Sequence, residues 1–334
     1  MAGGSERRCV ELANGIVKYT DHQACIYAER AFPESLLPLV HTGVEIVPNA
    51  VQQPERFYAA DKIIIVNTDC KEFSTKDYWA GKSARHNSVI DLRKVKHMTF
   101  LYNFLVSPSQ HLWEIANEVK VGIITTNRKF FKEITKQDRY EKVRLLPRYI
   151  LGSPIDPDSV VGGFRHEAKY FGCHSKRLGS KWNPEWPKLA DKITERYDEC
   201  EFRFMGMKSD VAKEMNAKST CLKENDEPVK HFLNSLDVFV FFPQYKREEP
   251  WARVIAEAMM AGLPIIALDR GGTSDQVLHW NNGILCRTFD DYHKAIVYMI
   301  EHPEAVEQMS RNSLRIAGDF TTERVIGKLM EILG

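Results

Sequence analysis

Residues 236–284, LDVFVFFPQYKREEPWARVIAEAMMAGLPIIALDRGGTSDQVLHWNNGI, contain two short apolar runs separated by a helix-like segment. The runs at 238–242 and 264–268 are β-branched and aromatic, which is typical of buried strands. Pro250 suits the first turn of a helix over residues 251–260, because its missing N–H would have no partner there, and Gly262 is typical of a helix end. The pattern predicts a strand–helix–strand unit of a parallel sheet, with its loops gathered at one edge.

Two carboxylates bracket the start of the predicted helix. Glu249 precedes it and Glu257 follows eight residues later, which corresponds to about 12 Å along a helix axis. Between them we expect the N–H groups of the first turn, at Trp251, Ala252 and Arg253, to attract phosphate. A carboxylate, an anion site and a second carboxylate spaced over this length would match the sugar, the diphosphate and the ribose of a nucleotide sugar. Carboxylates suit the sugar and the ribose because they accept hydrogen bonds from paired hydroxyls. Taken alone, the two glutamates could equally be solvated residues at a helix start.

The segments EPWARVIAEAMMAGLPIIA, GGTSD and NNGIL resemble the donor-binding segment of retaining glycosyltransferases of family 4, which have the GT-B fold. The E-x7-E motif of that family falls on Glu249 and Glu257. The resemblance implies that Glu249 holds hydroxyls of the donor sugar and that Glu257 holds the ribose. Trp251-Ala252 and Asp275 depart from the residues that the family often has, and a larger residue near the sugar could alter the choice of donor.

The same resemblance implies a phosphate-binding loop after the first strand of the second domain, which we expect at 168–172. In the family an arginine and a lysine of this loop hold the donor phosphates. Lys181 matches the lysine, whereas Arg177 is a looser match, because the usual arginine position is occupied by Cys173. Two such cations would stabilise the charge that develops on a diphosphate leaving group. The alternative is an exposed basic turn. Two glycines at turns where relatives approach the donor are further candidates: Gly206 and Gly272.

Composition is that of a globular protein of two domains: 334 residues, 43% hydrophobic and 27% charged. No apolar run approaches the roughly 18 residues of a membrane-spanning helix, and the N-terminus lacks the apolar core of a signal peptide. The seven cysteines include no C-x-x-C pair, which argues against a zinc site and a disulfide framework. The sequence therefore predicts a cytoplasmic protein.

Charge is unevenly distributed, with a net +5 over residues 1–150 and −4 over the remainder. The basic first half is compatible with an acidic acceptor or with peripheral contact to an anionic membrane, although so small an asymmetry can also be accidental. A glycan, a lipid-linked sugar and a small molecule all remain open as acceptors. A modified base in DNA or RNA is a narrower alternative, suggested by aromatic residues in the same half: Trp79, Tyr102 and Phe104.

The chain opens on a glycine turn that runs into an amphipathic helix up to residue 17. In family 4 a similar G-G-x-E-R turn follows the first strand of the N-terminal domain and lies near the donor diphosphate, which makes Gly3 and Gly4 candidates for donor contacts. A flexible terminus is the alternative. The strand that precedes this turn in the family is missing here, so that another segment, a partner chain or a rearranged sheet would have to replace it.

Further strands are expected at 22–27, 44–47, 62–66, 98–104, 121–125, 143–146 and 201–206. A serine-rich loop ending at His111 should begin a helix over 112–119. By the resemblance, His111 would face the donor sugar or the acceptor, although a histidine at a helix start is usually structural. Three prolines and two aspartates mark residues 147–158 as the interdomain linker.

These observations predict an α/β protein of GT-B fold, with two Rossmann-like domains that face a cleft. The domains are an acceptor-side domain over 1–150 and a nucleotide-sugar domain over 151–318. A final helix within 319–334 is expected to cross back to the first domain. The predicted activity is retaining transfer of a sugar from a UDP- or GDP-sugar to an acceptor hydroxyl, without a metal or other cofactor. Two alternatives stay open, a GT-B epimerase or hydrolase that acts on the donor alone, and a non-catalytic sugar-nucleotide-binding subunit.

Overall fold

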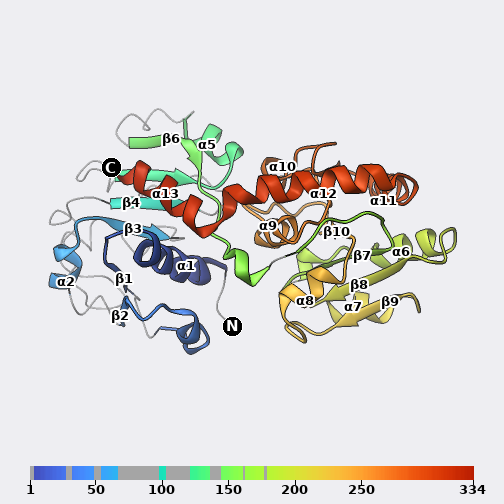
Figure 1. Cartoon of the computed structure of the whole chain (residues 1–334), viewed down its shortest axis with the longest axis horizontal. Helices are drawn as coiled ribbons and strands as arrows, with labels where there is room; N and C mark the ends of the chain where they lie inside the picture. The colour runs from blue at the N-terminus through green and yellow to red at the C-terminus, as the bar shows by residue number, and fades with distance from the viewer. Residues whose placement is uncertain are drawn as a thin grey trace. The chain divides into compact units, whose positions relative to one another are not determined.

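The structure is a computed structural model that describes residues 4–27, 32–48, 54–66, 98–102, 121–135, 144–160, 162–176 and 179–334 (Figure 1). It divides into two compact units. Unit 1 comprises Met1–Pro154 and Thr322–Gly334, and unit 2 comprises Ile155–Thr321. Residues 236–284 lie entirely within unit 2.

Unit 2 is built on a parallel sheet whose strand order is β12-β11-β10-β7-β8-β9. The strands are β7 (Tyr170–His174), β8 (Glu201–Met205), β9 (Ser219–Leu222), β10 (Val238–Phe241), β11 (Ile265–Leu268) and β12 (Gly283–Cys286). Counted from β7, this is the order 3-2-1-4-5-6 of a doubly wound sheet, in which the direction of winding reverses between the first and fourth strands. The reversal lies between β7 and β10, and in such sheets ligands bind at that point, beyond the carboxyl ends of the strands.

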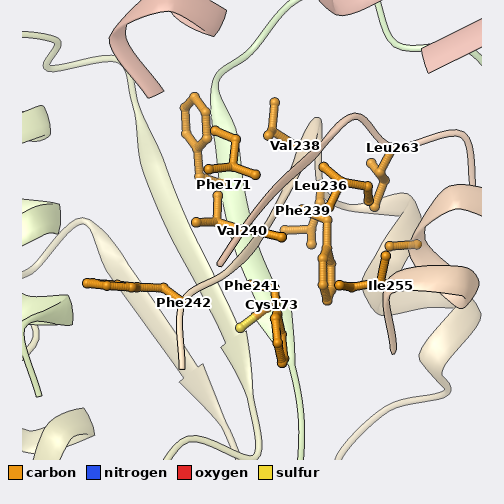
Figure 2. Close-up of a cluster of buried hydrophobic side chains, with 14 of the residues drawn as sticks. Phe171, Cys173, Leu236, Val238, Phe239, Val240, Phe241, Phe242, Ile255 and Leu263 are labelled. Carbon is orange, nitrogen blue, oxygen red and sulfur yellow. The ribbon is translucent and has the colours of Figure 1, made fainter. Parts of the chain in front are cut away.

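The centre of the sheet is apolar because it is covered on both faces. All four residues of β10 are buried, as are all four of β11. Side chains of β7, β10 and α9 (Arg253–Met260) form one buried cluster that includes Phe171, Cys173, Phe239 and Ile255 (Figure 2). The prediction of buried strands at 238–242 and 264–268 is confirmed, because a strand buried on both faces reads as a continuous apolar run.

The helices of unit 2 fill the connections between its strands. α9 packs against β10, β11 and α12, whereas α11 packs against β11, β12 and α6. The remaining elements are α6 (Trp186–Thr194), α7 (Ser209–Lys213), α8 (Val229–Asn234), α10 (Thr273–Gln276), α11 (Phe289–Glu301), α12 (Pro303–Ala317) and the 3-10 turns η5 (Pro157–Ser159), η6 (Gly179–Lys181) and η7 (Gly318–Phe320). Gly262, at φ 79°, ends the α9 region in the left-handed conformation that glycine favours.

Unit 1 holds a four-stranded parallel sheet of order β3-β4-β5-β6 and a separate parallel pair, β1-β2. Helices α1 and α13 pack against each other and are drawn side by side in Figure 1, in blue and red. The elements are α1 (Gly4–Tyr19), β1 (Ala24–Tyr27), η1 (Glu34–Leu39), β2 (Val44–Val47), α2 (Pro54–Ala59), β3 (Ile63–Val66), β4 (Met98–Tyr102), β5 (Val121–Thr125), α5 (Arg128–Thr135), β6 (Arg144–Ile150) and α13 (Thr322–Leu333). The final helix thus belongs to unit 1.

Two predicted boundaries are wrong. β6 continues to Ile150 through part of the predicted linker, with a register irregularity between the pairs Ile123–Leu145 and Thr125–Ile150. Pro147 falls inside this irregularity, where its missing N–H costs no regular ladder bond. β7 starts at Tyr170, two residues later than predicted, so that Cys173 belongs to the strand and not to the loop. Within the described residues, no helix is long and apolar enough to cross a membrane.

Candidate functional site

The candidate site lies beyond the carboxyl ends of β7 and β10, at the reversal of the strand order. Two segments converge there: η6, which follows β7, and the loop between β10 and α9. Their backbones are joined, because Gln244 N donates to Ser180 O at 3.2 Å and Asn183 N donates to Phe242 O at 3.2 Å. The two connections that flank the reversal point therefore hold each other in place.

Glu249 is the centre of the first group of charges. Arg247 Nε donates to Glu249 Oε1 at 2.6 Å, and Lys181 Nζ lies 3.4 Å from the same oxygen. Arg247 also donates to Ser180 Oγ through Nη1, at 2.5 Å. Glu249 is only 8% exposed. Two cations from different segments thus meet on one oxygen of a buried carboxylate.

This group carries an excess of positive charge. The side chains of Lys181 and Arg247 are 19% and 23% exposed, so that both cations are largely withdrawn from water. A single carboxylate compensates only one of them, and charges withdrawn from water require compensation. The arrangement therefore favours binding of an additional anion.

Glu257, on α9, is the centre of a second group. Arg253 Nε donates to Glu257 Oε1 at 2.7 Å, and His174 Nε2 lies 3.4 Å from Glu257 Oε2. His174 is the last residue of β7, and its ring packs edge-on against Phe232 and Phe239. Arg253 therefore fixes one oxygen of the Glu257 carboxylate, and the other oxygen lies next to His174 at the carboxyl end of β7.

Glycines after β11 support the segment that carries Glu249. Gly272 N donates to Glu249 O at 2.7 Å, and Gly271 forms an isolated parallel bridge with Glu249. A Cβ on Gly272 would lie 1.9 Å from Pro250 O, and Gly271 has a φ of 66°. Only glycine permits this close approach of the two backbones. Gly272 therefore acts on the site through the position of the Glu249–Pro250 backbone.

The predicted helix start is wrong by two residues. α9 begins at Arg253, and its N-cap Ala252 has an extended backbone at φ −88° and ψ 98°. The reason is a pair of hydrogen bonds from the Gln276 side chain, which accepts from Ala252 N at 2.8 Å and donates to Ala252 O at 3.0 Å. The helical spacing of about 12 Å does not apply, because residues 250–252, between the two glutamates, are not helical. The Ala252 N–H is bound to Gln276, so it is not a phosphate donor in this structure.

The other predicted residues occupy varied positions. Gly206 follows β8 with φ 83°, and a Cβ there would lie 2.1 Å from Ser175 O, so it packs beside the end of β7. Trp251 packs edge-on against Phe320, with ring centroids 5.5 Å apart. Gly4 is the first residue of α1, in unit 1. Three predicted site residues lie outside the described residues: Gly3, His111 and Arg177.

Sequence reasoning missed Arg247, His174, Ser180 and Gln276. Arg247 lies in the run KREE, two residues before Glu249, where spacing alone could have indicated an ion pair. His174 lies beyond the predicted end of the strand at 168–172, so the sequence does not indicate that it ends β7. Gln276 contacts Ala252 from 24 positions away, so no local signal indicates it. Among the described residues, no group of three or more His, Cys, Asp and Glu could hold a metal ion.

Parts of the chain that include residues of this site are similar to known proteins. Residues 187–315 match the family model described as "Glycosyl transferases group 1". Over 100 residues the chain is 36% identical to spore coat protein SA of Bacillus subtilis (strain 168), a match that covers 29% of this chain. It is also 36% identical over 80 residues, 23% of this chain, to the putative glycosyltransferase YtcC of the same organism. These matches span 26% and 19% of the lengths of the two relatives.

Solved structures resemble the chain over almost its whole length. Alr3699/HepE of Anabaena in complex with UDP matches with a TM-score of 0.72 and 17% identity, covering 99% of this chain and 96% of that one. A glycosyltransferase from Rickettsia africae ESF-5 matches with a TM-score of 0.71 and 11% identity, covering 99% of this chain and 94% of that one. The likeness establishes the fold, which is the α/β GT-B fold with Rossmann-like units.

Proposed function

We propose that this chain, whose residues 187–315 match the group 1 glycosyltransferases, transfers a sugar from a nucleoside diphosphate sugar to an acceptor hydroxyl. The observation that carries the proposal is the meeting of Lys181 and Glu249 at the carboxyl ends of β7 and β10. A cation is needed there to stabilise the departing diphosphate, and a carboxylate is needed to orient sugar hydroxyls.

In this proposal Glu249 positions the donor sugar, and Glu257 accepts hydrogen bonds from the ribose. Arg253 donates to one oxygen of the Glu257 carboxylate and His174 lies near the other, so the carboxylate is already oriented when the nucleotide arrives. Such orientation lowers the entropic cost of binding. We further propose retention of the anomeric configuration and metal-independent transfer, both on the resemblance of the E-x7-E segment to family 4 enzymes.

A UDP-sugar is the first donor to test. Similar structures have been solved with UDP and with UDP-glucose in Alr3699/HepE, and with UDP and GlcNAc in the pneumococcal O-GlcNAc transferase GtfA. We propose a cytoplasmic reaction, since the six cysteines in the described part of the chain are all free thiols.

A screen against UDP-, GDP-, ADP- and dTDP-sugars tests the proposal without knowledge of the acceptor. A ligand that binds only the native state stabilises it by about 2.7 kcal/mol at a hundredfold excess over its dissociation constant. We expect one nucleotide class to raise the unfolding temperature, and mass spectrometry to detect slow release of free sugar. An unchanged unfolding temperature with all four classes would contradict the proposal.

A further inference from the structure

We propose that Arg247 is a second cation of the donor site and binds the diphosphate of the nucleotide sugar directly. The inference rests on the proposed function and adds a residue that the family motif does not supply. It starts from the position of Arg247, whose Nε lies 2.6 Å from the carboxylate oxygen that Lys181 also approaches.

The net positive charge around Arg247 favours binding of an anion. Lys181 and Arg247 share the single negative charge of Glu249, and the neighbouring acids are engaged elsewhere. Glu248 Oε1 accepts from Arg270 Nε at 3.1 Å, and Glu185 Oε2 accepts from Tyr245 OH at 2.9 Å. One positive charge is thus left over at a largely buried position, which a diphosphate would neutralise.

The shape and position of the Arg247 guanidinium also suit a phosphate. The guanidinium group has five N–H donors in a planar fork that matches phosphate oxygens, and the two hydrogen bonds to Glu249 and Ser180 use only two of them. The contact with Ser180 places the guanidinium beside η6, the turn that carries Lys181. Both cations lie near the same Glu249 oxygen and can therefore reach the same anion.

Cys173 occupies the usual position of the family's phosphate-binding arginine. Its side chain is 3% exposed and lies in the hydrophobic cluster of β7 and β10 (Figure 2). Burial raises the pKa of the Cys173 thiol, so that it stays neutral and supplies no charge. Arg247 supplies a guanidinium from the loop after β10, on the other side of the reversal point.

The test compares Arg247→Gln with the unaltered chain by calorimetric titration with UDP, UMP and uridine, or with the guanosine series if GDP is the nucleotide that binds. We expect the variant to bind the diphosphate at least tenfold more weakly, the monophosphate a few-fold more weakly and the nucleoside equally well. Arg287→Gln is the matched control, because Arg287 also pairs with a carboxylate after a neighbouring strand but is 78% exposed. This control should keep all three affinities.

The outcomes separate the two proposals. If the unaltered chain binds no nucleoside diphosphate, the proposed function fails. If it binds one and Arg247→Gln keeps the affinity ratio between diphosphate and monophosphate, Arg247 only positions Glu249 and the inference is overturned. If Arg247→Gln does not fold, Arg247→Lys is tested in its place, since lysine keeps the positive charge but lacks the planar fork of N–H donors of the guanidinium group. We expect that variant to lower the ratio severalfold, and an unchanged ratio would again overturn the inference.

Discussion

Glu249 has two successive sets of partners in this account. Without donor, its Oε1 atom holds Arg247 and Lys181. If the proposed function holds, an entering diphosphate would compete for the same two cations, and the carboxylate would become available to sugar hydroxyls. The resting contacts thus compensate the buried carboxylate and one of the two positive charges, and the second positive charge is the one that the diphosphate would neutralise.

Glu249→Gln should separate turnover from affinity. Without the negative charge, the diphosphate no longer competes for Lys181 and Arg247, so UDP should bind equally well or more tightly. Sugar positioning is weakened, and we expect kcat to fall about 100-fold, in line with the 1.5–3 kcal/mol of a charged hydrogen bond. Steady-state kinetics with calorimetry would test this, and an unchanged kcat would contradict the role of Glu249.

Glu257→Gln should have the opposite effect, because its proposed contacts are with the non-reacting ribose. We expect the dissociation constant of the nucleotide to rise about tenfold or more, while kcat at saturation changes little. The glutamine keeps the shape of the side chain beside Arg253 and His174, which limits disturbance of the fold. A fall in kcat without loss of affinity would refute the assignment to the ribose.

Among single residues, the sequence predicts those that share a local motif and misses those whose partners are distant along the chain. Glu249, Glu257 and Lys181 follow from spacing and resemblance. His174 and Gln276 could not be predicted, because their partners lie 83 and 24 positions away. Their roles depend on which strand ends are adjacent, and a single sequence does not give that information.

At the scale of elements, two glycines inside helices offer a direct contrast. Gly327 lies in the middle of α13, and nothing in the described part of the chain lies within 4 Å of an added Cβ there, whereas a Cβ on Gly15 of α1 would lie 2.6 Å from Ile326 Cγ1. Gly15 is therefore the residue at which α1 and α13 approach closely.

Gly327→Ala should stabilise unit 1 by about 1 kcal/mol, because alanine is the better helix former. Gly15→Ala gains the same propensity but overpacks the contact with α13, at a cost of about 1–3 kcal/mol. Urea unfolding of both variants should therefore give shifts of the midpoint in opposite directions. A stabilising Gly15→Ala would contradict the packing of α1 on α13.

The N-terminus of α11 is held by a capping box. Asp291 N donates to Thr288 Oγ1 at 3.2 Å, and Asp291 Oδ2 accepts from Thr288 N at 2.9 Å. The backbone N–H of Arg287 and the Thr288 contacts lower the pKa of Asp291, against a smaller opposing effect of burial. This contribution to stability is present above the ordinary pKa of 3.8 and is lost as the pH falls through the lowered value.

Asp291→Asn should accordingly lower the free energy of unfolding by about 1 kcal/mol at pH 7. The difference from the unaltered chain should shrink as the pH falls below 3.8. Asp290→Asn is the control, because Asp290 lies in the same first turn and is exposed but takes no part in the box. Equal losses in both variants would show that general helix-end electrostatics, and not the cap, is responsible.

Strands were the elements that the sequence predicted best. The runs at 44–47 and 121–125 coincide with β2 and β5, because buried strands concentrate apolar residues within their bounds. Helix starts were less predictable. Pro250 indicated a first turn, but the Gln276 side chain holds Ala252 extended and delays α9 to Arg253.

At the scale of the whole molecule, the sequence predicted two α/β parts and a final helix, and the structure gives the strand order of each sheet. The order in unit 2 could not be read from the chain, because β7 pairs with β10 across more than sixty residues. That pairing creates the reversal point at which Lys181 and Glu249 meet. The site is thus a product of topology as much as of motif.

Hydrogen exchange measured by mass spectrometry, with and without the nucleoside diphosphate that raises the unfolding temperature most, would locate the donor site on the chain. The donor site is assigned to the turn after β7 and to the segment from Gln244 to Glu257. We therefore predict that the ligand slows exchange in peptides covering 174–181 and 244–257. Slowed exchange confined to peptides of unit 1, with these two segments unchanged, would contradict the account.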